Sequence, residues 1–188
     1  GIRDGGVTGV QTCALPISGS HYFGIMADPA ATDIDGMHLR WFEHWLNEEK
    51  NGITEEAPVR IFVMGDDVWR EEEEWPLARA QETKYYLHSG GKANSKQADG
   101  NLSVESPQSE APDVFLYNPD DPVPTTGSAL CCNPYYAANG AYDQNQVEER
   151  QDVLVYSTPP LEQDMEVTGP VTVTLWASTS AKIGRAHV

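Results

Sequence analysis

Five short runs of alternating or β-branched residues lie after residue 55, and no helical pattern separates them. Gly, Pro, Asn, Asp or Ser follows most of these runs, as is usual for the strands of an all-β domain. The expected strands are 59–64, 84–88, 114–117, 152–156 and 171–177. Short strands joined by long polar turns are typical of a β-sandwich or jelly roll. The sequence therefore predicts a mainly β fold.

A single amphipathic helix is predicted before these strands, at 30–49. Its large apolar residues recur at three- and four-residue spacing and so share one face. They are Ile34, Met37, Trp41 and Trp45. Asp28 and Pro29 suit the start of a helix, and Asn51-Gly52 suits its end. Because so apolar a stripe needs a large partner surface, we expect the helix to pack on a domain outside this chain.

The charge of the chain excludes several classes of partner. Its 29 acidic side chains outnumber its 12 basic ones, which gives a formal net charge of −17. Binding to nucleic acid or to anionic lipid requires basic surfaces that neutralise phosphate. No apolar run approaches the length of a membrane span. We therefore expect neither a nucleic-acid nor a membrane partner.

The chain contains no recognisable metal or cofactor motif. His38, His44 and His88 lack the spacing of an H-E-x-x-H or similar site, so packing or surface roles are expected for them. The four consecutive glutamates at 71–74 are interpreted as a solvated acidic loop. We expect no metal ion and no cofactor.

The adjacent cysteines Cys131 and Cys132 are the most unusual local feature. A disulfide between neighbouring residues strains the backbone, and a redox motif would usually read C-x-x-C. Two free thiols in a loop are therefore expected, either as a small apolar pair or as part of a site. Free thiols favour a reducing compartment such as the cytoplasm.

Six segments in a fixed order resemble the CocE/NonD hydrolases, a family of serine esterases and acylases related to the X-Pro dipeptidyl-peptidases. They are LRWFEHWL at 39–46, PVRIFVMG at 58–65, YYLHSGGKA at 85–93, YNPDDPVPT at 117–125, RQDVLVYSTPPL at 150–161 and VTGPVTVTLWASTSA at 167–181. The resemblance implies an α/β-hydrolase domain with a helical cap, followed by a galactose-binding-like jelly roll. Residues 19–54 would be the tail of the hydrolase domain, and 55–181 would be part of the jelly roll.

The implied reaction is acyl transfer from an ester, an amide or an X-Pro peptide, by a Ser–His–Asp triad. The family places all three triad members before Phe23 of this chain, and no G-x-S-x-G occurs in the sequence. His21 lacks the family's G-P-W-x-H context and takes no catalytic role. The resemblance thus implies that this chain contains no catalytic residue. It also implies that the partners of the chain are the missing hydrolase and cap domains of the same protein.

The same resemblance implies one contribution to the substrate pocket. In the family a jelly-roll loop lines the acyl site, and the matching stretch at 129–133 places Cys131 and Cys132 near it. The chain departs from the family pattern here, since it has two thiols and extra residues at 135–139.

Both ends of the chain look like translated sequencing-adapter DNA. The segments are 1–18, which includes VTGVQTCALPI, and 182–188, which ends in IGRAHV. We expect neither segment to belong to the protein.

Two other functions stay open from the residues alone. A β-sandwich could be a carbohydrate-binding module without catalysis, in which Tyr135, Tyr136 and Tyr142 stack on sugar rings. It could also have a purely structural role in a homo-oligomer.

Overall fold

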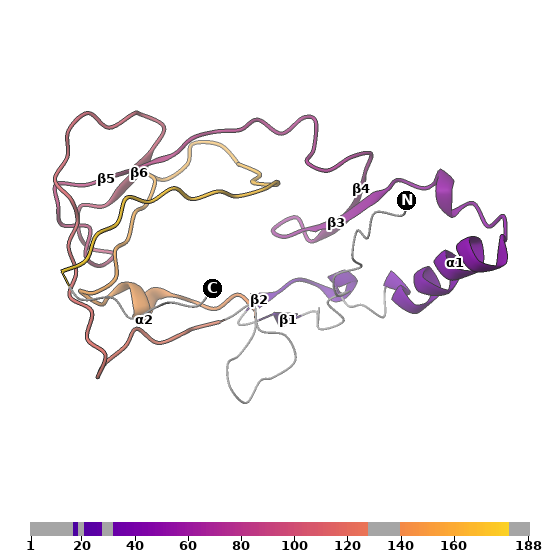
Figure 1. Ribbon diagram of the computed structural model, residues 1–188, viewed down its shortest axis with the longest axis horizontal. Helices are drawn as coiled ribbons and strands as arrows, with labels where there is room; N and C mark the ends of the chain where they lie inside the picture. Colours follow the sequence, from indigo (N-terminus) through magenta and orange to yellow (C-terminus); the bar gives the residue numbers. More distant parts are fainter. Residues whose placement is uncertain (1–16, 19–20, 28–31, 128–139, 181–188) are drawn as a thin grey trace.

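The computed structural model of the protein describes residues 17–18, 21–27, 32–127 and 140–180. These residues form two α-helices, α1 (Ile34–Asn47) and α2 (Asn145–Glu148), and two 3-10 turns, η1 (Ile25–Ala27) and η3 (Ile53–Glu55). Their strands are β1 (Ile17–Ser18), β2 (His21–Tyr22), β3 (Val59–Val63), β4 (Val68–Glu72), β5 (Tyr86–His88) and β6 (Asn101–Ser103). They pair in sequence order as three antiparallel two-stranded sheets. Figure 1 shows α1 at one end of the long axis and β5, β6 and α2 towards the other.

Mainly β structure was expected, and the small antiparallel sheets with few helices confirm it for the described part of the chain. The jelly-roll arrangement of those strands stays a prediction.

The predicted helix exists but is shorter than 30–49. It begins after Asp33, whose side chain accepts a hydrogen bond from the Gly36 N–H (3.2 Å) and so caps the first turn. It ends before Glu48, whose left-handed backbone (φ 56°) stops the helical ladder. Asp28 and Pro29, the predicted start, lie outside the described residues. The start signal was therefore read too early, because Asp33 caps the helix instead.

The apolar stripe of α1 is exposed to solvent. Trp41 is 49% exposed and Trp45 is 55% exposed, and their rings lie 5.7 Å apart. Leu46, at the end of the stripe, is 74% exposed. The stripe is thus unburied in this chain.

The β3–β4 hairpin carries a small aromatic cluster. Phe62 and Trp69 face each other across the register with ring centroids 5.4 Å apart, and Phe23 meets Phe62 edge-on at 6.3 Å. The Trp69 Nε1–H donates to the Met26 carbonyl (2.7 Å), which ties η1 to β4. The predicted strand 59–64 is therefore confirmed as β3, and its partner β4 was missed.

Strand β4 also corrects the interpretation of 71–74 as a solvated acidic loop. Strand alternation turns Glu72 inward, where it is buried, while Glu71 stays exposed. Arg70 and Arg79 both form ion pairs with Glu72, the Arg70 Nε at 2.6 Å. Arg70 also holds Glu166 through two bonds of 2.6 and 3.0 Å. A buried carboxylate needs such partners, so this part of the acidic run is a strand with an ion-pair network.

The β5–β6 sheet and the segments around it form a second packed region. Strand β5 occupies the last three residues of the predicted strand 84–88. Segment 153–157 crosses beside the loop that precedes β6 and beside β6 itself, with bridges from Asn94 to Leu154 and from Asn101 to Ser157. Ala93, fully buried at this crossing, accepts a backbone hydrogen bond from the Val155 N–H (2.8 Å).

Three predicted strands were wrong as continuous strands. Residues 114–117 and 171–177 have no regular secondary structure and no ladder partner in the described part of the chain, and 152–156 contains only the bridge at Leu154. Leu116 is 83% exposed and Trp176 is 99% exposed. The physical reason is that a strand requires a paired neighbour, whereas alternation only prepares a segment for pairing.

Candidate functional site

One polar group that connects several segments of the described chain is the Asp113 carboxylate. It accepts hydrogen bonds from the Tyr156 hydroxyl (2.6 Å), the Ser89 hydroxyl (2.7 Å) and the Ala93 N–H (2.8 Å). These donors come from three segments, namely the end of β5, the turn after it and the crossing segment 153–157. Asp113 therefore joins the elements at the centre of the β5–β6 region.

The electrostatics of this cluster follow from the same contacts. Partial burial opposes ionisation of Asp113, but its three donors outweigh burial and hold its pKa below the usual 3.8. Burial and the neighbouring carboxylate both raise the pKa of Tyr156 above its usual 10.0. The cluster is therefore a neutral phenol donating to an ionised carboxylate at neutral pH.

Removing the Tyr156 hydroxyl tests this connection. We expect Tyr156→Phe to lower the free energy of unfolding by about 1 kcal/mol, since Asp113 keeps two of its three donors. Urea unfolding followed by tryptophan fluorescence measures the change. Tyr117→Phe is the matched control because Tyr117 is 65% exposed. An equal loss in both variants would show that the hydroxyl of Tyr156 contributes nothing.

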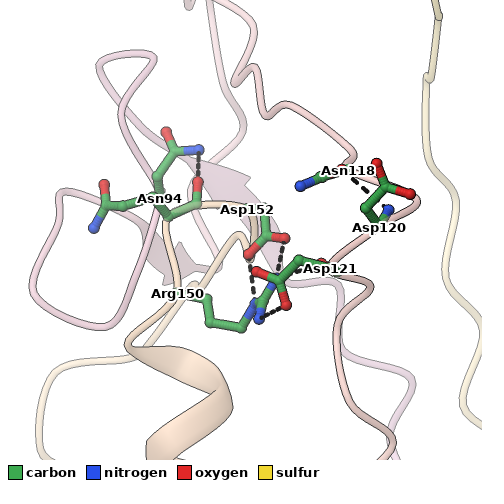
Figure 2. Close-up of polar contacts among 7 residues, drawn as sticks. Asn94, Asn118, Asp120, Asp121, Arg150 and Asp152 are labelled. Atoms are coloured by element: carbon green, nitrogen blue, oxygen red, sulfur yellow. Dashed lines mark hydrogen bonds and ion pairs between the residues drawn. The ribbon is translucent and has the colours of Figure 1, made fainter.

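A second polar centre is built on Arg150 (Figure 2). Its Nε and Nη2 donate to the Asp152 carboxylate at 2.7 Å each, and its Nη1 and Nη2 reach the Asp121 carboxylate at 3.2 and 3.3 Å. Nη2 also donates to the Asp121 carbonyl (2.8 Å). The two aspartates raise the pKa of Arg150, and Arg150 lowers the pKa of Asp152. This arginine holds the 118–122 turn against the segment that begins at 150.

An open pocket of about 340 Å³ lies over this centre. Its lining residues are Leu116, Asn118, Asp121, Arg150, Gln151 and Asp152. Asn118 is used within its own turn, where its side chain accepts from the Asp120 N–H (3.1 Å). All three guanidinium nitrogens of Arg150 already have carboxylate or carbonyl partners. The pocket therefore offers no unpaired arginine to an anionic ligand. The role of Arg150 is to hold the 118–122 turn in position.

The predicted pocket residues belong to the segment 128–139, and the described residues on either side of it contact each other. Gln144 Nε2 donates to the carbonyls of Thr126 (2.7 Å) and Tyr142 (3.1 Å). Gly127 has φ +75°, and a Cβ on it would lie 2.5 Å from the Gly140 carbonyl. The residues on either side of 128–139 therefore lie against each other.

The predicted site residues themselves fall within that segment. Cys131 and Cys132 lie outside the described residues, as do Tyr135 and Tyr136. Tyr142 is described and is half-buried at the base of the segment.

Two of the histidines contact oxygen atoms of nearby residues. His44 Nδ1 contacts the Glu49 carbonyl (2.9 Å) beyond the end of α1, and His88 contacts Glu110 (2.6 Å). Within the described ranges, no group of three or more His, Cys, Asp or Glu side chains could hold a metal ion. No described helix is long and apolar enough to cross a bilayer.

Comparison with protein families gives a match over residues 51–188 to the X-Pro dipeptidyl-peptidase C-terminal non-catalytic domain. The chain belongs to this family. The chain is also 40% identical to cocaine esterase of Rhodococcus over 159 residues, which cover 85% of the chain. It is 28% identical to predicted serine esterases of Mycobacterium bovis and Mycobacterium tuberculosis, over 83% of the chain. These matches confirm the resemblance to the CocE/NonD hydrolases.

The chain spans 27% of the length of the Rhodococcus esterase and 23% of each mycobacterial relative. The family description places no catalytic role on the matched residues. This agrees with the contacts above, in which Asp113 and Arg150 connect segments within the chain.

Sequence reasoning missed Asp113, Tyr156 and Arg150 as the centres of the region. The Arg150-x-Asp152 spacing was a usable signal for the arginine cluster, since the Nε and Nη2 bonds reach only two residues ahead. Asp113 had no local signal, because its donors lie 20 or more residues away along the chain.

Proposed function

We propose that the chain is the non-catalytic jelly-roll part of a serine hydrolase that cleaves ester or amide bonds. The observation that carries this proposal is the match of residues 51–188 to a domain described as non-catalytic. The identity to an esterase over most of the chain supports the reaction class. Residues 19–54 then form the tail of the α/β-hydrolase domain, and 55–181 form part of the jelly roll.

The exposed stripe of α1 supports a catalytic domain as the partner within the same protein. Trp41, Trp45 and Leu46 are each about half exposed or more. Burying a side chain of this size contributes roughly 1.5–3 kcal/mol. A hydrolase domain packed on α1 would bury this stripe.

In this proposal the chemistry belongs to that partner domain. A serine on a G-x-S-x-G turn attacks the substrate carbonyl, a histidine takes its proton, and an aspartate orients the histidine. Small-molecule esters or amides and X-Pro peptides are the proposed substrates. The jelly roll shapes one wall of the site and supplies no reacting group.

The experiment that tests the function is to sequence the gene upstream of residue 19. A G-x-S-x-G followed by an aspartate and a G-P-W-x-H motif is expected. A signal peptide or linker in that place would overturn the proposal and favour a carbohydrate-binding module. The same read decides whether residues 1–18 belong to the gene, and a read downstream of residue 181 decides this for 182–188.

We propose further that Cys131 and Cys132 line the acyl pocket of the complete enzyme. Support comes from the family resemblance and from the closed base formed by Gly127, Gly140 and Gln144.

Replacing both thiols with tryptophan should narrow that pocket. In the complete enzyme, Cys131→Trp with Cys132→Trp should lower kcat/KM for long acyl chains at least about tenfold relative to acetyl esters, the range for misfit of a few methylenes. Hydrolysis rates across a p-nitrophenyl acyl series measure it. The control is Gln163→Trp with Asp164→Trp, an adjacent exposed pair. Unchanged selectivity in the cysteine variant would remove these residues from the pocket.

A further inference from the structure

His88 ends β5 and contacts two parts of the loop that follows β6. Its Nδ1 lies 2.6 Å from the Glu110 carboxylate, and its Nε2 lies 2.9 Å from the Glu105 carbonyl. The His88 side chain is only 16% exposed. The imidazole is therefore held between two oxygen atoms.

Both of those partners can only accept. A carbonyl carries no proton, and an ionised carboxylate carries none either. A neutral imidazole has one N–H and can satisfy one of them, whereas the imidazolium has two and satisfies both. The observed geometry thus fits the charged form of His88.

The loop at 104–112 depends on such contacts. Every residue in it is exposed, so apolar burial contributes little to holding it in place. At its start the Glu105 N–H donates to the Ser103 hydroxyl (3.1 Å), and at its end Glu110 accepts from the Ser89 N–H (3.3 Å). In the part of the chain that the structure describes, His88 is the side chain hydrogen-bonded to both arms of the loop.

We propose that His88 is a pH-sensitive clasp, which closes the 104–112 loop onto the end of β5 when the imidazole is protonated and releases one arm when it loses a proton. The acidic side chains that act on it are Glu110 and Glu105 on the loop, and the charge of each favours the imidazolium over the neutral ring. Asp113 and Asp99 have other partners nearby, since they accept from the Ser89 hydroxyl and from the Gly90 N–H (3.0 Å).

The direction of the pH dependence follows from the pKa of each partner. The bond to Glu110 is the largest influence on His88 and raises its pKa above 6.5, against the opposing effect of burial. The contribution of the charged ring is therefore complete below 6.5 and is lost as pH rises through the higher folded pKa. Glu110, whose pKa His88 lowers from 4.5, loses its contribution only as pH falls through that lowered value. The clasp thus opens on the alkaline side.

Hydrogen exchange of the full chain tests the clasp. Exchange of peptides that cover 104–112 is compared at pH 6.0 and pH 8.5, with labelling times scaled for the intrinsic rate. We expect scaled exchange to be about two- to fivefold faster at pH 8.5, the range for one partly exposed ion pair. His88→Gln, which cannot become charged, should exchange fast at both pH values.

Two further variants separate the clasp from a general effect of pH. His38→Gln, on α1, should keep the dependence of the unchanged chain. Glu110→Gln should move the midpoint of the exchange transition to lower pH, even if His88→Gln folds poorly. Equal scaled exchange at both pH values, or a dependence that survives in His88→Gln, would overturn the proposal.

Discussion

Expressed as its 188 residues, the chain should hydrolyse p-nitrophenyl acetate no faster than bovine serum albumin at equal concentration. The sequence contains no G-x-S-x-G turn, and the hydroxyl of Ser89, which directly follows His88 at the end of β5, already has hydrogen-bond partners. The Ser89 hydroxyl donates to Asp113 (2.7 Å) and accepts from the Gly91 N–H (3.0 Å). His88 bonds Glu105 and Glu110 instead, so the group that accepts the Ser89 hydrogen bond is the Asp113 carboxylate, whose lowered pKa makes it a weak base.

The complete hydrolase of the proposed function should show the activity that this chain lacks. A complete hydrolase should turn over the ester and take a fluorophosphonate label on its nucleophilic serine, whereas the 188-residue chain should take none. Ser89→Ala serves as the control and should leave the background rate unchanged. A rate clearly above albumin, lost in Ser89→Ala, would place a nucleophile in this chain and contradict the non-catalytic assignment.

Local pattern predicted those elements whose stabilising contacts are themselves local. The 3.6-residue spacing of Trp41 and Trp45 located α1, and the β-branched run at 59–64 located β3. Both depend on neighbours within a few residues or on a tight hairpin. The boundary of α1 was wrong because Asp28 was taken as the start signal, whereas the side chain of Asp33 caps the first turn.

Non-local contacts explain what the sequence could not predict. Strand β4 carries charged residues, and its Arg70 has a partner, Glu166, that lies 96 residues further along the chain. The run at 171–177 alternates well but has no described neighbour to bond, so Trp176 is almost fully exposed. The centre at Asp113 likewise draws its donors from distant segments. The pattern of apolar and charged residues shows which side chains of a segment could be buried. Pairing with a neighbouring segment determines which of them are buried.

Gly100→Ala should cost more stability than any other substitution considered above. A Cβ at residue 100 would lie 1.9 Å from the Val155 carbonyl oxygen and 3.0 Å from the Ala93 Cβ. Neither neighbour can retreat freely, since Ala93 is fully buried and accepts from the Val155 N–H (2.8 Å). The Gly100 carbonyl also accepts from the Ser157 N–H (3.4 Å). Relief of the clash therefore requires the crossing segment to move and its backbone bonds to break.

We expect this substitution to lower the free energy of unfolding by about 3 kcal/mol or more, the sum of overpacking and lost backbone bonds. Gly52→Ala is the matched comparison. It meets open space but has φ +79°, so only backbone strain of about 1 kcal/mol is expected. Urea midpoints of both variants, measured with the same probe, give the difference. The free energy of unfolding lost in Gly100→Ala would be no larger than that lost in Gly52→Ala only if segment 153–157 does not pack against Gly100. That result would contradict the crossing that brings Tyr156 to Asp113.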